Sequence, residues 1–156
     1  MTTFDYQSPS AILILKHKLA FKDSNIIIDR WLAEHPQESR KTLSELLQSG
    51  KVIFKDNKLC DLPQLSAEEA QLLAQEIQSS QTFEVKDRWY NLKKYPQCFV
   101  GSELADWLKQ NKHVLIEEAV ALGQNLLKYG LIYHVHNDHD FKNEFLFYRF
   151  STSLPK

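Results

Sequence analysis

The chain of 156 residues is poor in glycine and cysteine, which excludes several kinds of catalytic site. Its four glycines stand too far apart to build a phosphate-cradling loop, and it has no Gly-x-Ser-x-Gly nucleophile motif. Its two cysteines, Cys60 and Cys98, lack the spacing of a metal site and are expected to be free thiols in a reducing cytosol. We therefore expect no enzymatic activity, no cofactor and no small-molecule substrate.

Long apolar runs and a strong net charge are also absent. The longest apolar run, Ala11–Leu15, is far shorter than the roughly 20 residues that span a bilayer. Asp5 comes early and no basic segment precedes it, which argues against a signal peptide. The formal net charge of −1 gives no general attraction to nucleic acid or to membranes. The expected location is the cytoplasm, with peripheral contact at the inner membrane face left open.

The composition is that of a folded protein, with 43% hydrophobic and 25% charged residues. The length fits one ordinary domain or two small ones. Pro63 and Gln64 form a short joint between a first part, residues 1–65, and a second part, residues 66–156.

Residues 1–65 have the pattern of three helices followed by a hairpin. The expected elements are a helix or strand over Ala11–Phe21, a helix capped by Ser24 and ended by Pro36, a helix with a Thr42–Glu45 capping box and Gly50 after its end, and a hairpin over Val52–Leu62 turning at Asp56-Asn57. This order is that of a winged helix. Leu-Leu-x-x-Gly at 46–50 recurs at 126–130, and Trp-Leu at 31–32 recurs at 107–108, which leaves a structural repeat and chance both open.

The second part contains a strong helix-start pattern, Tyr95–Leu108, which reads YPQCFVGSELADWL. Gly101 is expected to let the backbone turn, and Ser102 is expected to cap the helix. Apolar residues at i, i+3 and i+4 from Leu104 lie on one helical face. Earlier in this part, Ser66 and Glu69 form a capping box for another helix.

Three sequence blocks of the second part resemble the DEP family, the module first recognised in dishevelled and pleckstrin. They are VKDRWYNLKKYPQCFVGSELADWL, EEAVALGQNLLKYGLIYHV and HDFKNEFLFYRF, in the order and spacing of the family. The resemblance covers Ser66–Ser151 and implies an α+β, winged-helix-like fold with three helices, a β-hairpin arm and a C-terminal β-hairpin. It places helices near 67–79, 102–110 and 116–129, the arm near 85–99 and the wing near 131–150. We therefore expect a DEP domain at 66–156. Residues 1–65 lie outside the resemblance, and it is their own pattern that indicates a helical segment with the element order of a second winged helix.

The resemblance also implies a function, because known DEP modules are non-catalytic adaptors of intracellular signalling that contact proteins and membranes. In the family, the arm and its basic residues often make the contact. The matching positions here are Lys86, Arg88, Lys93 and Lys94. Glu84 and Asp87 reduce the local charge from +4 to +2, which gives about 2 kcal/mol toward an anionic surface. Since that is too weak for stable anchoring, we expect an unidentified signalling protein as partner, with anionic phospholipid headgroups as a weaker one.

Nucleic-acid binding by a tandem winged-helix protein is the alternative function. It is suggested by the basic residues that flank the third helix and the hairpin of the first part, Arg40, Lys41, Lys51, Lys55 and Lys58. Against it, Glu117 and Glu118 begin the last helix of the second part and would repel phosphate, so nucleic acid is not the expected partner.

Three histidines near the C-terminal hairpin could offer ligands to a metal ion. They are His134, His136 and His139. Because the residues between them are typical of an ordinary polar turn, we expect no metal there.

Overall fold

The computed structural model describes residues 6–151, and the chain forms two compact units, Met1–Leu62 and Pro63–Lys156. Asp5 and the expected domain ends at residues 1 and 156 lie outside the described residues. The division of the chain into domains after residue 65 stays a prediction. Among residues 6–151, no helix has both the length and the apolar character needed to cross a bilayer.

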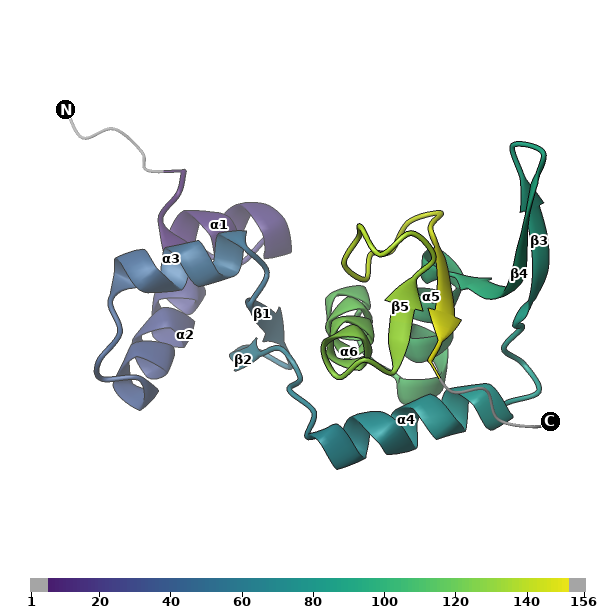
Figure 1. The fold of residues 1–156 in the computed structure, drawn as a ribbon. Coiled ribbons are helices and arrows are strands. Elements are labelled where there is room, and N and C mark those ends of the chain that lie inside the picture. Colours follow the sequence, from purple (N-terminus) through teal and green to yellow (C-terminus); the bar gives the residue numbers. More distant parts are fainter. Residues whose placement is uncertain (1–5, 152–156) are drawn as a thin grey trace. The chain divides into compact units, whose positions relative to one another are not determined.

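The first unit contains three helices followed by a two-stranded antiparallel hairpin. They are α1 (Pro9–His17), α2 (Phe21–Glu34), α3 (Arg40–Gln48), β1 (Val52–Lys55) and β2 (Lys58–Asp61), in the colours purple to blue in Figure 1. The segment Ala11–Phe21, which fitted a helix or a strand, is helical only as far as His17, because Lys18 ends α1 with a positive φ and Phe21 already begins α2. Its first turn is capped by the Ser8 hydroxyl, which accepts the Ala11 N–H at 3.2 Å. The hairpin turns at Asp56 and Asn57 as predicted, and both have positive φ.

Two helix starts in the first unit differ from the prediction. Ser24 is not a cap but a buried residue inside α2, where its hydroxyl donates to the Phe21 carbonyl oxygen at 2.8 Å. In α3 the cap is Ser39, because its side chain accepts the Thr42 N–H at 3.2 Å. The core of the unit contains Trp31, which is buried.

The second unit is α+β and has the winged-helix-like arrangement predicted for it. Its elements are α4 (Ala67–Ser79), β3 (Lys86–Tyr90), β4 (Lys93–Val100), α5 (Gly101–Lys112), α6 (Ile116–Lys128), β5 (Ile132–His134) and β6 (Phe147–Phe150). The four strands form one antiparallel sheet in the order β3-β4-β6-β5. The helices, the arm and the C-terminal hairpin thus lie where the DEP resemblance placed them.

The core of the second unit joins all three helices to the sheet. Apolar residues of α4 such as Ile77 pack in one cluster with Trp107 of α5, Leu126 of α6 and Tyr148 of β6. The predicted Ser66–Glu69 capping box is present, with both of its hydrogen bonds, at 3.0 and 3.1 Å. Since α4 shares the core, it belongs to the same folded unit as the arm and the wing.

The start of α5 is different from the predicted one. The helix begins at Gly101, and Ser102 lies inside it instead of capping it. The free amides of the first turn are satisfied by the wing, because Gly101 N–H donates to Leu146 O at 2.8 Å and Ser102 N–H donates to Glu144 O at 3.0 Å. Glycine is needed here for close approach and not for a turn: a Cβ at residue 101 would lie 2.5 Å from the Lys142 carbonyl oxygen.

Each unit has the same local structure where its last helix leads into its terminal hairpin. Gly50 follows α3 and Gly130 follows α6, both with positive φ, at +78° and +71°. In both places the N–H after the glycine donates to the carbonyl oxygen of the first leucine in the Leu-Leu pair, at 2.9 Å. The recurring sequence therefore forms the same local structure twice, and this local match leaves a repeat of the whole fold and chance both open.

Candidate functional site

The arm is the feature of the second unit that extends away from its helices (Figure 1). It is the hairpin of β3 and β4, paired from Tyr90–Lys93 at the tip to Lys86–Cys98 at the base. Only the last two residues of β4, Phe99 and Val100, also pair with β6. The outer part of the arm is therefore a two-stranded ribbon.

A bulge bends the base of the arm. The register shifts between Lys86 and Arg88, and on the opposite strand Gln97 has a positive φ of 47°. The Asp87 carboxylate fixes this bend, since its Oδ1 accepts the Gln97 backbone N–H at 2.9 Å and the Gln97 side-chain amide at 3.2 Å. The hydrogen bond from the Gln97 backbone, followed by that from Lys94, lowers the pKa of Asp87.

The tip of the arm exposes an apolar residue in a strained position. Asn91 and Leu92 form the two-residue turn, with φ of 52° and 64°. The second position of such a turn favours glycine, because a side chain in the left-handed region costs about 1 kcal/mol or more. Leu92 nevertheless occupies it and is 99% exposed, and the neighbouring Trp89 is 70% exposed. Folding of the unit explains neither the strain nor the exposure.

The two faces of the arm carry different side chains. On one face Tyr90 lies 5.7 Å from Phe145 of the wing, and Tyr95 lies 5.1 Å from Phe147, measured between ring centroids. This aromatic face continues from the arm onto the wing, and Phe145 remains exposed. Trp89 belongs to the opposite face, because side chains alternate along a strand.

The structure brings the four predicted basic residues together on the arm, but most of them are paired. The ion pairs are Lys86–Glu84 at 2.9 Å, Arg88–Glu103 at 3.0 Å and Lys94–Asp87 at 3.2 Å. Lys93 instead places its ammonium 5.4 Å from the centre of the Tyr95 ring. Bonding to Lys86 lowers the pKa of Glu84, so this partner is ionised at neutral pH.

These pairs weaken the electrostatic part of the site. Glu84 and Asp87 are the two carboxylates that the sequence sets against the four basic residues. Glu103 of α5 is a third carboxylate, and it reduces the summed charge of these residues from +2 to +1. What sequence reasoning missed is the apolar tip, Leu92, together with Phe145 beside the arm. The signal for Leu92 was available: Asn-Leu stands where hairpins usually have Asn-Gly.

The helices that would read nucleic acid carry mixed charge. In the first unit, the exposed residues of α3 include Arg40, Lys41 and Glu45, and Arg40 is paired with Asp29 at 3.1 Å. In the second unit, α6 begins with Glu117 and Glu118. Neither helix presents the continuous basic face that a recognition helix needs.

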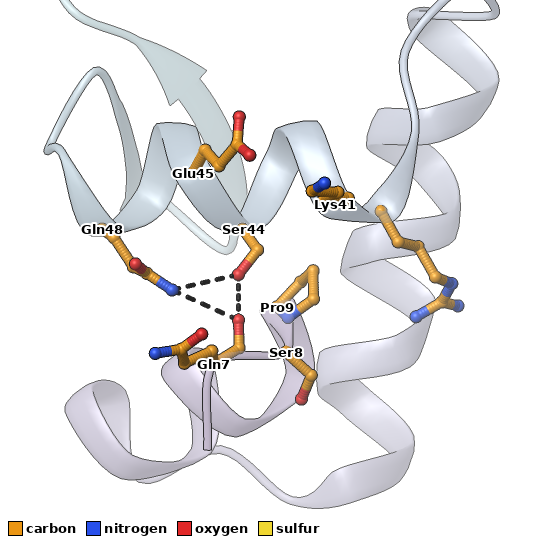
Figure 2. Close-up of a pocket in the computed structure, with 8 residues that line it drawn as sticks. Gln7, Ser8, Pro9, Lys41, Ser44, Glu45 and Gln48 are labelled. Carbon is orange, nitrogen blue, oxygen red and sulfur yellow. Dashed lines mark hydrogen bonds between the residues drawn. The ribbon is translucent and has the colours of Figure 1, made fainter. Parts of the chain in front are cut away.

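A cavity of about 580 Å³ lies between the start of α1 and one side of α3 in the first unit (Figure 2). Ser44 and the Gln48 side chain both donate to the Gln7 backbone oxygen, and Gln48 also donates to Ser44 at 3.3 Å. The polar groups at its centre thus satisfy one another. This arrangement ties the start of α1 to α3 and offers little to a ligand.

The second unit, with its three helices, arm and terminal hairpin, is a winged-helix-like module whose prominent surface is a hairpin tip. Residues 82–150 match the family described as "Domain found in Dishevelled, Egl-10, and Pleckstrin (DEP)". The second unit therefore contains a DEP domain. The matched stretch is shorter than the predicted Ser66–Ser151 and leaves out α4, although α4 shares the core. A DEP domain is a non-catalytic module.

The curated relatives include Rac exchanger proteins and vacuolar membrane-associated proteins. The phosphatidylinositol 3,4,5-trisphosphate-dependent Rac exchanger 1 protein of Mus musculus is 33% identical over 136 residues, which cover 83% of this chain and 8% of that protein. The human Rac exchanger 2 protein is 46% identical over 67 residues, 42% of this chain and 4% of that protein. The vacuolar membrane-associated protein IML1 of Saccharomyces cerevisiae is 36% identical over 110 residues, 67% of this chain and 7% of that protein.

The coverage of these matches has two consequences. The chain spans less than a tenth of the length of these relatives. The match to the Mus musculus protein is longer than the second unit, so it extends into Met1–Leu62. Part of the first unit is thus also similar to the Mus musculus protein.

Proposed function

We propose that this chain is a non-catalytic interaction module of intracellular signal transduction, which uses the tip of its arm to contact a signalling protein and, more weakly, an anionic membrane surface. The observation that carries the proposal is Leu92, an apolar side chain that is 99% exposed in a turn position that favours glycine. The names of the relatives support the setting, since one group is named for phosphoinositide-dependent exchange and another for vacuolar membrane association.

Magnitudes favour the apolar tip over the basic residues as the main source of membrane affinity. Complete burial of a leucine side chain is worth about 2 kcal/mol, which corresponds to a factor of about thirty in binding. A local charge of +1 gives only about 1 kcal/mol near an anionic surface. We therefore expect Leu92 to contribute more than the basic side chains, with Trp89 as a second group at the interface.

Vesicle co-sedimentation tests the membrane part of the proposal. Wild-type protein should bind vesicles that contain phosphatidylserine more strongly than neutral vesicles. Leu92→Gly should weaken this binding by a factor of about thirty, and it should not lower the melting temperature because glycine relieves the turn. Lys93→Glu/Lys94→Glu should remove the preference for anionic lipid.

Matched controls keep the test specific to the arm. Leu72→Ala removes another exposed leucine, on α4, and should leave binding unchanged. Lys22→Glu/Lys41→Glu makes the same change in net charge on exposed residues of the first unit and should also have little effect. Equal vesicle binding by Leu92→Gly and wild type would refute the role of the arm tip. Absence of vesicle binding by the wild type would refute membrane binding by this chain.

The proposed contact with a signalling protein can be tested with the same variants. In pull-downs from cell extract, a partner that docks on the arm should be retained by wild type and Leu72→Ala and lost with Leu92→Gly. A partner retained equally by all three proteins would place the protein contact elsewhere.

A further inference from the structure

Three side chains with metal-binding atoms converge in the connection between β5 and β6, away from the tip of the arm. They are His134, Asp138 and His139, whose ligand atoms all lie within 4.8 Å of one another. The Nδ1 atom of His134 lies 2.8 Å from Asp138 Oδ1, and His139 Nε2 lies 3.8 Å from the same oxygen. Two imidazole nitrogens and one carboxylate oxygen are a ligand set that zinc accepts.

The spacing of these atoms is close to that of a metal site. A tetrahedral zinc ion with ligand distances of about 2.0–2.2 Å holds its ligand atoms about 3.4 Å apart. The two separations around Asp138 fall on either side of this value. His134 is only 4% exposed and has a fixed position, whereas Asp138 and His139 are exposed and can adjust their rotamers.

The Nδ1 atom of His134 faces both the turn and the carboxylate. It lies 3.2 Å from the backbone nitrogen of His136 and 2.8 Å from Asp138 Oδ1. Because an imidazole nitrogen has one lone pair, a bound zinc ion would replace the His136 N–H as the partner of Nδ1.

From this geometry we infer, against the expectation from the sequence, that His134, Asp138 and His139 bind a zinc ion that fastens the connection between β5 and β6. A cavity of about 280 Å³, lined in part by His134, Asn137 and His139, gives room for a water molecule as the fourth ligand. The ring of His136 is turned to the Tyr95 hydroxyl, at 3.4 Å, and is not a ligand.

The ion would act on the core through the residues that follow it in the chain. Phe141 is fully buried, and its N–H is bound by the neighbouring Asp140 carboxylate at 2.7 Å. The Asp140 carbonyl oxygen accepts the Tyr148 hydroxyl at 2.6 Å. Zinc bound at residues 134–139 would therefore hold the segment that places Phe141 in the core. The stability of the wing would then depend on zinc.

Calorimetric titration of the full chain, purified without a histidine tag, with zinc chloride tests this inference. One zinc ion should bind per chain. Asp138→Asn and His139→Ala, both at exposed positions, should weaken binding by at least about tenfold, whereas His136→Ala should not. Zinc should also raise the melting temperature of wild type and of His136→Ala, but not that of His139→Ala.

Two results would overturn the inference. One is the absence of saturable binding to the wild type, which would leave the cluster as a proton-mediated His134–Asp138 pair. The other is an equal loss of affinity with His136→Ala and His139→Ala, which would show general binding to histidine instead of a built site. Neither result bears on the arm, which is tested with other variants.

Discussion

Gly123, in the middle of α6, offers a sharp test of how the wing packs on the helices. A methyl group at this position would overlap the Phe141 ring, with Cδ2 at 2.5 Å and both Cδ1 and Cε1 closer still. Carbon atoms in contact stay about 3.5 Å or more apart, so Gly123→Ala requires the ring to move by more than about 1 Å. The ring cannot move freely, because it is fully buried and lies against Tyr148, with 5.4 Å between ring centroids.

Two opposing effects set the magnitude. Alanine in a helix interior is favoured over glycine by about 1 kcal/mol. Overpacking of a well-packed core costs about 3 kcal/mol at the upper end of the usual range. The net result is a loss of about 2 kcal/mol in the free energy of unfolding, which for a unit of this size lowers the melting temperature by about 8–16 °C.

The assay is a double-mutant cycle followed by urea unfolding. In a Phe141→Ala background the clash is absent, so Gly123→Ala should raise the free energy of unfolding by about 1 kcal/mol. A Phe141→Leu background, milder in its own effect, should give a smaller reversal. Gly123→Ala could instead stabilise the wild type, or destabilise the wild-type and Phe141→Ala backgrounds equally. Either result would refute the described packing of Phe141 against α6.

Two further predictions concern titratable groups of the second unit. Hydrogen bonding to Ser66 lowers the pKa of Glu69, so the contribution of this carboxylate to stability is present above the unfolded pKa and is lost as pH falls through the lower folded pKa. In urea unfolding, the stability difference between wild type and Glu69→Gln should therefore shrink on acidification. A difference that stays constant with pH would contradict the capping role. Burial raises the pKa of the Cys98 thiol, so in the folded Cys60→Ser variant Ellman's reagent should react with Cys98 only slowly at pH 8, and labelling as fast as in urea would contradict its burial.

Much of the second unit could be predicted from its sequence, because three motifs and regular apolar spacing agree with one another. The failures are at helix starts. Serine and threonine are common near helix starts, and which of them caps depends on contacts that local sequence does not contain. At α5 the amides of Gly101 and Ser102 bind carbonyl oxygens of the wing, more than 40 residues away. A local rule therefore placed a cap where tertiary structure had already satisfied the backbone.

The candidate site shows the same division between local and distant information. The position of Lys86, Arg88, Lys93 and Lys94 on the arm followed from the family resemblance. Their neutralisation by Glu103 could not be predicted, because that carboxylate belongs to α5. The convergence of His134 with Asp138 depends on an irregular turn, which residue spacing alone does not define.

The bulge at Gln97 separates two sections of the arm that differ in stability. Beyond it, the pairs Arg88–Tyr95 to Tyr90–Lys93 have no third strand, and an isolated two-stranded ribbon is only marginally stable. This outer section is joined to the rest of the unit through side chains, the rings of Tyr90 and Tyr95 on the wing and the Arg88–Glu103 pair, so it can open at a lower free-energy cost than the segment paired with β6. The surface that meets a partner is a small cooperative unit with its own lifetime, and a partner that captures the closed hairpin slows the opening of the arm without touching the core.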